Sequence, residues 1–152
     1  GGGPTPPVPH AGYAPTLGVV WDMVGDTALT FFVERISLER ARPQVQAVWT
    51  TAERLGYGGV FRRAAPMRVV DDHVPLLDAG LPVVDVIDAH FPAHHSLQDD
   101  LGAVHPRSLQ IVGDVATALV RSRGPGRGGG GGGRVPWVAG ADAGADARAG
   151  ER

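Results

Sequence analysis

The sequence predicts an α/β layered domain over residues 16–122, because two buried strands and two amphipathic helices alternate along it. Nearly continuous apolar runs of strand length occur at Leu17–Val24 and Leu81–Ile87, as expected for strands covered on both faces. Apolar residues recur at helical spacing between Val45 and Leu55 and again between Pro106 and Val120. Polar side chains should therefore gather beyond the carboxyl ends of the strands.

The first strand carries a carboxylate, Asp22, that interrupts its apolar run. After a less regular stretch, the first helix is indicated by Val45, Val48, Trp49, Ala52 and Leu55. Pro43 falls near its first turn, and Gly56 and Gly58 follow its end, which are the positions that these residue types favour.

The second half of the domain begins with a short predicted strand, Met67–Val70, which leads directly into Asp71, Asp72 and His73. A brief helical turn should run from Pro75 to Leu77, before the strand Leu81–Ile87, which is rich in β-branched residues. A loop dense in His, Asp and Pro then spans Asp88–Leu101. The last helix should present one apolar face, made of Leu109, Val112, Ala116 and Leu119.

The two ends of the chain have a different composition from this domain. Many of the 23 glycines and 13 prolines fall there, without helical or strand periodicity, so we expect a low-complexity lead at 1–15 and a disordered glycine-rich tail at 123–152. The formal net charge of -2, with no basic stripe, argues against a nucleic-acid partner. No apolar stretch approaches the roughly 20 residues that cross a bilayer, so no membrane span is predicted.

Histidine and aspartate are concentrated in one region. Five of the 6 histidines lie between His73 and His105, interleaved with aspartates. The chain has no cysteine, so any zinc site must use imidazole and carboxylate ligands. Loops of this composition are often merely solvated, and composition alone leaves both interpretations open.

The order of the motifs is more specific. The segments Trp21–Asp26, Asp71–Leu77, Gly80–Val83 and His95–Asp100 follow one another with spacing that resembles the latter half of the zinc aminopeptidase and glutaminyl cyclase family, over about Leu17–Val120. The resemblance implies an α/β/α sandwich with a central mixed sheet, one or two zinc ions at the carboxyl ends of the strands, and peptide substrates. By analogy alone, it also implies a periplasmic or secreted parent protein.

The resemblance also implies roles for individual residues. His95 matches a zinc-ligand histidine, and Asp22 matches an aspartate that binds metal in two-zinc members and joins a hydrogen-bond network in one-zinc members. Asp72 matches a carboxylate that helps to place the reacting group, and Asp71 is a weaker candidate on the substrate side. His94 is a candidate substrate contact, standing where many relatives have tryptophan.

Structural roles compete with these assignments. His95 could instead be a loop histidine paired with Asp99, and Asp22 could be the cap of a helix or a turn. For His73 we expect a structural role in orienting the local turn rather than a catalytic one.

Two motifs that the family requires do not occur in these 152 residues: a His-x-Asp motif and a consecutive Glu-Glu pair. The glutamates, Glu34, Glu39, Glu53 and Glu151, never adjoin one another. We therefore expect the C-terminal part of a zinc exopeptidase, which would hydrolyse peptides with zinc-activated water when complete and be inactive alone, with weak zinc affinity and poor solubility. The alternatives are a glutaminyl-peptide cyclase-like enzyme, or a noncatalytic truncated remnant or binding module. Oligomeric state is left open.

Overall fold

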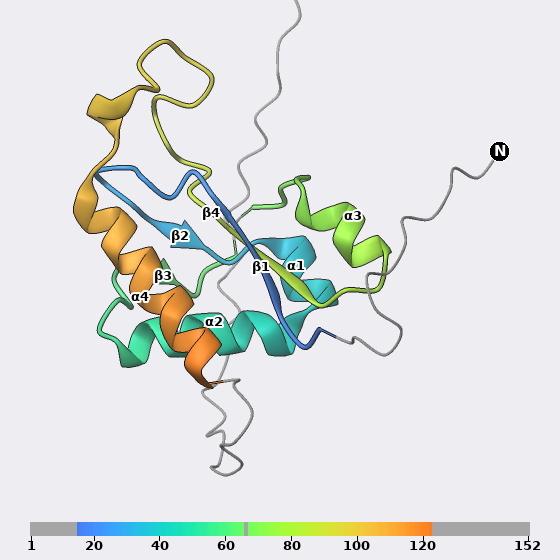
Figure 1. The fold of residues 1–152 in the computed structure, drawn as a ribbon. Helices are drawn as coiled ribbons and strands as arrows, with labels where there is room; N and C mark the ends of the chain where they lie inside the picture. Colours follow the sequence, from blue (N-terminus) through green and yellow to red (C-terminus); the bar gives the residue numbers. More distant parts are fainter. Residues whose placement is uncertain (1–14, 66, 123–152) are drawn as a thin grey trace, which may run out of the picture.

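A computed structural model of the chain describes residues 15–65 and 67–122 (Figure 1). The elements in chain order are β1 (Gly18–Asp22), β2 (Phe31–Phe32), α1 (Arg35–Arg40), α2 (Arg42–Arg54), β3 (Phe61–Arg62), α3 (His73–Asp78), β4 (Val83–Ile87), a 3-10 turn (Leu101–Ala103) and α4 (Pro106–Ser122). The glycine-rich tail predicted at 123–152 lies outside the described residues, as does the predicted lead apart from its last residue.

The centre of the fold is a parallel pair of strands, β1 and β4, which lie side by side in Figure 1. Their register runs from Gly18 opposite Val83 to Asp22 opposite Ile87. Every residue of β4 is buried, whereas every residue of β1 is only half-buried. The short strands β2 and β3 form a second parallel pair, and the antiparallel pairing in the described segments is one isolated bridge between Asp26 and Val104. The predicted α/β class is confirmed.

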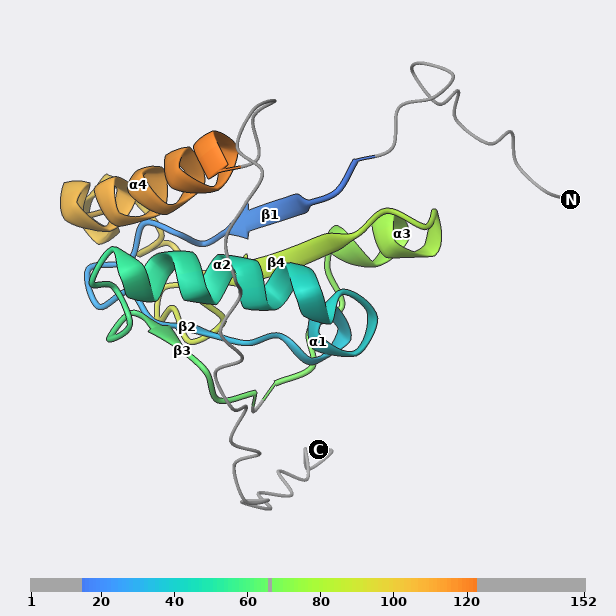
Figure 2. The same ribbon diagram turned by 90° about the horizontal axis from the view of Figure 1, so that it is seen from below.

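Helices cover both faces of the β1–β4 pair because side chains alternate along each strand. Val84 and Val86 belong to the larger core, together with apolar residues of α2 and α4. Val83 belongs to a second core cluster with Ile36 of α1 and Leu77 of α3. Figure 2 shows α1 and α3 on the side of the pair away from α4. The layers are those of an α/β/α sandwich.

The predicted helix over Val45–Leu55 is confirmed as α2, and its apolar face is buried at Val45, Val48, Trp49 and Ala52. Trp49 is fully buried, its indole Nε1 donates to the carbonyl of Arg62 at 3.0 Å, and its ring meets the Phe61 ring edge-on at 5.7 Å. Leu55 follows the last helical turn and is 42% exposed, so it contributes little to this face.

The last helix is confirmed as α4, and of its predicted apolar face Val112 and Leu119 are buried, Ala116 is half-buried and Leu109 is wrong. Ile111, Val112, Val115 and Leu119 are buried, whereas Leu109 is 46% exposed. The reason lies in the first turn, where the buried Ser108 hydroxyl donates to the carbonyl of Asp26 at 2.6 Å. This bond turns Ser108 toward the core and its neighbour Leu109 toward solvent.

The predicted strand Met67–Val70 is also wrong, because these residues form no ladder with another strand. They run beside the start of α1, where the Arg35 amide donates to the Met67 carbonyl at 3.0 Å and the Val69 amide donates to Glu34 Oε1 at 3.1 Å. In a strand the Val69 amide would donate to a backbone carbonyl of a neighbouring strand, whereas here it donates to the Glu34 carboxylate.

Candidate functional site

Three carboxylates meet where the parallel strands end: Asp22, Asp71 and Asp72, here termed the acidic cluster. Asp22 is the last residue of β1, and its carbonyl accepts from the amide of Asp88, the first residue after β4, at 3.4 Å. Asp71 and Asp72 immediately precede α3, and both act electrostatically on Asp22. The predicted gathering of polar groups at this edge therefore holds for these side chains.

The acidic cluster concentrates negative charge. Burial raises the pKa of Asp22, the Met23 amide that donates to its Oδ1 at 2.8 Å opposes this, and the neighbouring Asp71 and Asp72 raise it further. The Oδ2 atom of Asp71 is buried and receives no hydrogen bond from any described donor. No arginine or histidine within the described ranges forms an ion pair with Asp22. The acidic cluster is therefore a site of concentrated negative charge in the part of the chain that the structure describes.

The backbone beside Asp22 is also unusual. Met23 has a φ of 49°, in the left-handed region that residues other than glycine seldom adopt. His95 shares this property with a φ of 57°. Such conformations cost of order 1–3 kcal/mol each and concentrate at functional sites, which makes both positions candidates.

His95 lies on the exposed loop between β4 and α4, and its ring stacks on that of His94 at 3.6 Å. The alternative pairing with Asp99 is not among the ion pairs of the described residues. Across residues 15–65 and 67–122, no group of three or more His, Asp or Glu side chains is arranged to hold a metal ion. A catalytic zinc usually takes three protein ligands, so the described donors are at most part of such a site. The predicted roles of Asp22, Asp71, Asp72, His94 and His95 stay predictions.

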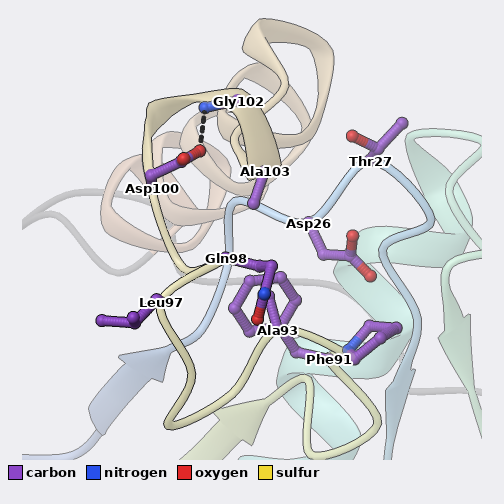
Figure 3. A pocket seen from close by; sticks show the side chains of 10 residues that line it. Asp26, Thr27, Phe91, Ala93, Leu97, Gln98, Asp100, Gly102 and Ala103 are labelled. Carbon is purple, nitrogen blue, oxygen red and sulfur yellow. Dashed lines mark hydrogen bonds between the residues drawn. The ribbon is translucent and has the colours of Figure 1, made fainter.

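A shallow cleft of about 440 Å³ lies between the loop after β4 and the segment after β1. In Figure 3 the loop after β4 forms one side of this cleft, and Asp26 and Thr27 form the other. The 3-10 turn closes it, where the Gly102 amide donates to Asp100 Oδ1 at 2.7 Å. Its lining combines apolar and acceptor groups and consists of Asp26, Thr27, Phe91, Pro92, Ala93, Leu97, Gln98, Asp100, Gly102 and Ala103. Neither predicted substrate contact, His94 or Asp71, lines it.

Sequence reasoning did not single out three buried carboxylates that support this edge: Glu34, Asp85 and Asp88. Asp88 accepts from the amides of Thr30 at 3.1 Å and His90 at 3.3 Å, and burial raises its pKa. Burial, with Asp71 and Glu34 adding to it, raises the pKa of Asp85 to about 7. An aspartate inside the apolar run of β4 was the available signal, because a buried charge requires a partner.

Several solved structures share this fold at appreciable identity. The glutaminyl cyclase of Porphyromonas gingivalis is 31% identical with a TM-score of 0.70, over 76% of this chain and 43% of that one. A leucine aminopeptidase precursor from Bacteroides thetaiotaomicron is 28% identical with a TM-score of 0.72, over 77% of this chain and 41% of that one. A Zn-dependent exopeptidase from Parabacteroides distasonis is 30% identical with a TM-score of 0.69, over 76% and 43%. The chain thus spans less than half the length of each.

The fold is therefore that of the zinc exopeptidases and glutaminyl cyclases, as the resemblance implied. The sequence profile of peptidase family M28 matches residues 12–120, and the chain belongs to this family. Comparison with curated proteins gave no match. In the part of the chain that the structure describes, no helix has the length and apolar character needed to cross a membrane.

Proposed function

We propose that this chain supplies the C-terminal part of a zinc-dependent exopeptidase that removes residues from peptide termini. The observation that carries the proposal is the meeting of Asp22 with the Asp71–Asp72 turn at the carboxyl ends of the parallel strands. Membership of peptidase family M28 supports hydrolysis as the reaction, and a Zn-dependent exopeptidase among the similar structures supports zinc as the metal.

Within this proposal, Asp22 and His95 are the zinc ligands that the chain contributes. Asp22 offers a half-buried carboxylate in a negatively charged setting, and His95 offers an accessible imidazole. A zinc ion held there would supply Lewis acidity and would make water a better nucleophile, which is the chemistry that peptide hydrolysis requires. Asp72 is exposed at the rim of the cluster, where it can orient the substrate amine or the attacking group.

The isolated chain is expected to be inactive because its ligand set is incomplete. The family's His-x-Asp and Glu-Glu motifs are missing from these 152 residues, so a third ligand and the general base must come from elsewhere. Every residue of β1 is only half-buried, as expected if another part of the complete domain packs against this strand. Zinc affinity of the chain alone should be weak.

Zinc titration by calorimetry tests the ligand assignment on the 152-residue chain. Asp22→Asn and His95→Gln should each reduce the weak zinc binding further. Matched controls are Asp78→Asn, an exposed aspartate paired with Arg40, and His90→Gln, an exposed histidine outside the acidic cluster. Sub-micromolar binding together with aminoacyl-peptide cleavage by the chain alone would show that the proposed incompleteness is wrong.

Glutaminyl cyclization is the second candidate, favoured by the glutaminyl cyclases of Porphyromonas gingivalis and Tannerella forsythia, both 31% identical to this chain. In that reaction the substrate's own amine attacks its side-chain amide and releases ammonia without consuming water. The tryptophan frequent in relatives is His94 here, which favours hydrolysis. Translating the coding region upstream of Gly1 should reveal His-x-Asp and Glu-Glu motifs. The protein that includes this upstream region is then assayed on glutaminyl peptides. Release of ammonia would indicate cyclization, and release of a free amino acid would indicate hydrolysis.

The third candidate is a noncatalytic remnant or binding module. If the upstream region encodes neither the His-x-Asp nor the Glu-Glu motif in any frame, this hypothesis replaces both enzymatic ones. If the motifs are present, Asp22→Asn and His95→Gln in the extended protein should abolish turnover, whereas Asp78→Asn should not.

A further inference from the structure

Glu34 contacts both flanks of the Asp71–Asp72 turn. Its Oε1 accepts from the Val69 amide at 3.1 Å on one side of the turn. Its Oε2 lies 3.2 Å from Nε2 of His73 on the other side. The same carboxylate caps α1 by accepting from the amides of Ile36 at 2.8 Å and Ser37 at 2.6 Å. One buried side chain therefore joins α1 to both ends of the acidic turn.

Three backbone N–H groups donate to the Glu34 carboxylate. Such donors stabilise a negative charge, as does a position at the start of a helix. Glu34 is 3% exposed, so its charge is out of water and requires a counter-charge. The only ion-pair partner of Glu34 among the described residues is His73.

His73 faces a second carboxylate on its other side. Its Nδ1 lies 3.4 Å from Asp85 Oδ2 in the middle of β4, and both side chains are fully buried. Neither ring nitrogen forms a well-aligned hydrogen bond, so a neutral ring would leave buried polar atoms without compensation. Coulomb attraction needs no such alignment, and a positive ring would face a carboxylate at each nitrogen.

The surroundings of this pair are uniformly negative. Asp22, Asp71, Asp72 and Glu34 each raise the pKa of Asp85, and no arginine within residues 15–65 and 67–122 forms an ion pair with any of them. Burial and these four charges together raise the pKa of Asp85 to about 7. The His73 ring lies between Glu34 and Asp85 in these surroundings, and it is the side chain there that can carry a compensating positive charge.

We propose that Glu34 and a doubly protonated His73 form a buried ionic clamp that positions the Asp71–Asp72 turn beside Asp22. His73 and Glu34 are positioning residues here, since neither reaches the surface at which a substrate would bind. The clamp follows from contacts within this chain, and only the catalytic purpose of the turn rests on the proposed function.

The protonation of His73 can be read directly from the 152-residue chain at pH 7 by long-range proton–nitrogen correlation spectra of its histidine rings. We expect one imidazole with both nitrogens protonated and with two slowly exchanging ring N–H protons, because His73 is fully buried. A buried ring with one protonated and one unprotonated nitrogen would overturn the ionic clamp. This measurement needs no variant, no metal and no substrate.

A matched pair of variants tests the positioning role. Glu34→Gln removes the charge and turns an amide donor toward N–H groups. Amide exchange at Val69 should therefore accelerate about tenfold or more, and exchange at Val74, whose amide donates to the Asp71 carbonyl at 2.9 Å, should follow. Glu39→Gln makes the same chemical change at an exposed glutamate that pairs with Arg68 and should alter neither amide.

Unchanged exchange at Val69 in Glu34→Gln, or equal acceleration in both variants, would refute the clamp. If Glu34→Gln does not fold, the histidine spectrum of the natural chain still decides its ionic character. Failure of the proposed peptidase function would leave these readouts unaffected, since none of them involves zinc or turnover.

Discussion

The orientation of α4 can be tested by truncating two of its aliphatic residues that lie two positions apart. Ile111→Ala and Leu109→Ala remove the same number of carbon atoms from one helix, so burial is the main difference between them. Ile111 is 7% exposed, and Leu109 is 46% exposed. Sequence periodicity favours Leu109 as the core residue, whereas the structure favours Ile111.

The magnitudes follow from these exposures. At about 0.8 kcal/mol per buried methylene, and with a term for the cavity left behind, Ile111→Ala should cost about 3 kcal/mol of unfolding free energy. Leu109→Ala loses only part of the transfer term and leaves no enclosed cavity. Since alanine also favours the helix slightly, its cost should be about 1 kcal/mol or less.

Urea unfolding followed by far-UV circular dichroism measures both variants. With a slope of about 2 kcal/mol per molar urea, the Ile111→Ala midpoint should fall by roughly 1.5 M and that of Leu109→Ala by about 0.5 M or less. Equal losses, or a larger loss for Leu109→Ala, would refute the orientation of α4 and with it the anchoring of the helix through Ser108.

Three further outcomes are expected. Because the raised pKa of Asp22 lets the folded state keep a proton that the unfolded state has lost, stability should fall as pH rises from about 4 toward neutral. Asp22→Asn should reduce this fall, to which the raised pKa values of Asp85 and Asp88 also contribute, and urea-midpoint profiles that stay parallel in the two proteins would contradict the role of Asp22. Ser37→Ala should cost about 1–3 kcal/mol in urea unfolding, because the buried Asp85 amide donates to Ser37 Oγ at 3.0 Å; an unchanged midpoint would count against that bond. Gly18→Ala should cost a similar amount in thermal unfolding, because its Cβ would lie 2.9 Å from Val83 Cγ2 at the β1–β4 contact; unaltered stability would show that the strands can separate.

Elements with a strong local pattern could be predicted from the sequence. The strands β1 and β4 and the helices α2 and α4 each carry an apolar period, and their structural bounds differ little from the predicted ones. The strands β2 and β3 have two residues each, too few to show any period. The helix α1 begins at Arg35, and its N-cap, Glu34, is not a residue type usual at that position, so the sequence held no recognisable start signal.

The candidate site was predictable to the extent that strand ends define it. Asp22 follows from the rule that polar groups collect at the carboxyl ends of parallel strands, because it ends β1. Asp71 and Asp72 were singled out by the family resemblance, since the residues before them form no strand. The contacts of Glu34 with Val69 and His73 could not be foreseen, because they join positions far apart in sequence and depend on how α1 packs against α3. Among residues 15–65 and 67–122 no group of side chains is arranged to hold a metal ion, so a shared role of His95 and Asp22 stays a prediction.

The contrast between a fully buried β4 and a half-buried β1 has a consequence for handling the protein. Within the described segments β1 pairs with one strand only, and Val19 and Trp21 on it are partly uncovered. An open strand edge beside apolar side chains can recruit further copies of the same strand, so assembly should be nucleated and steeply dependent on concentration. Light scattering of a dilution series should therefore show a threshold, and storage below that threshold should keep the chain dispersed.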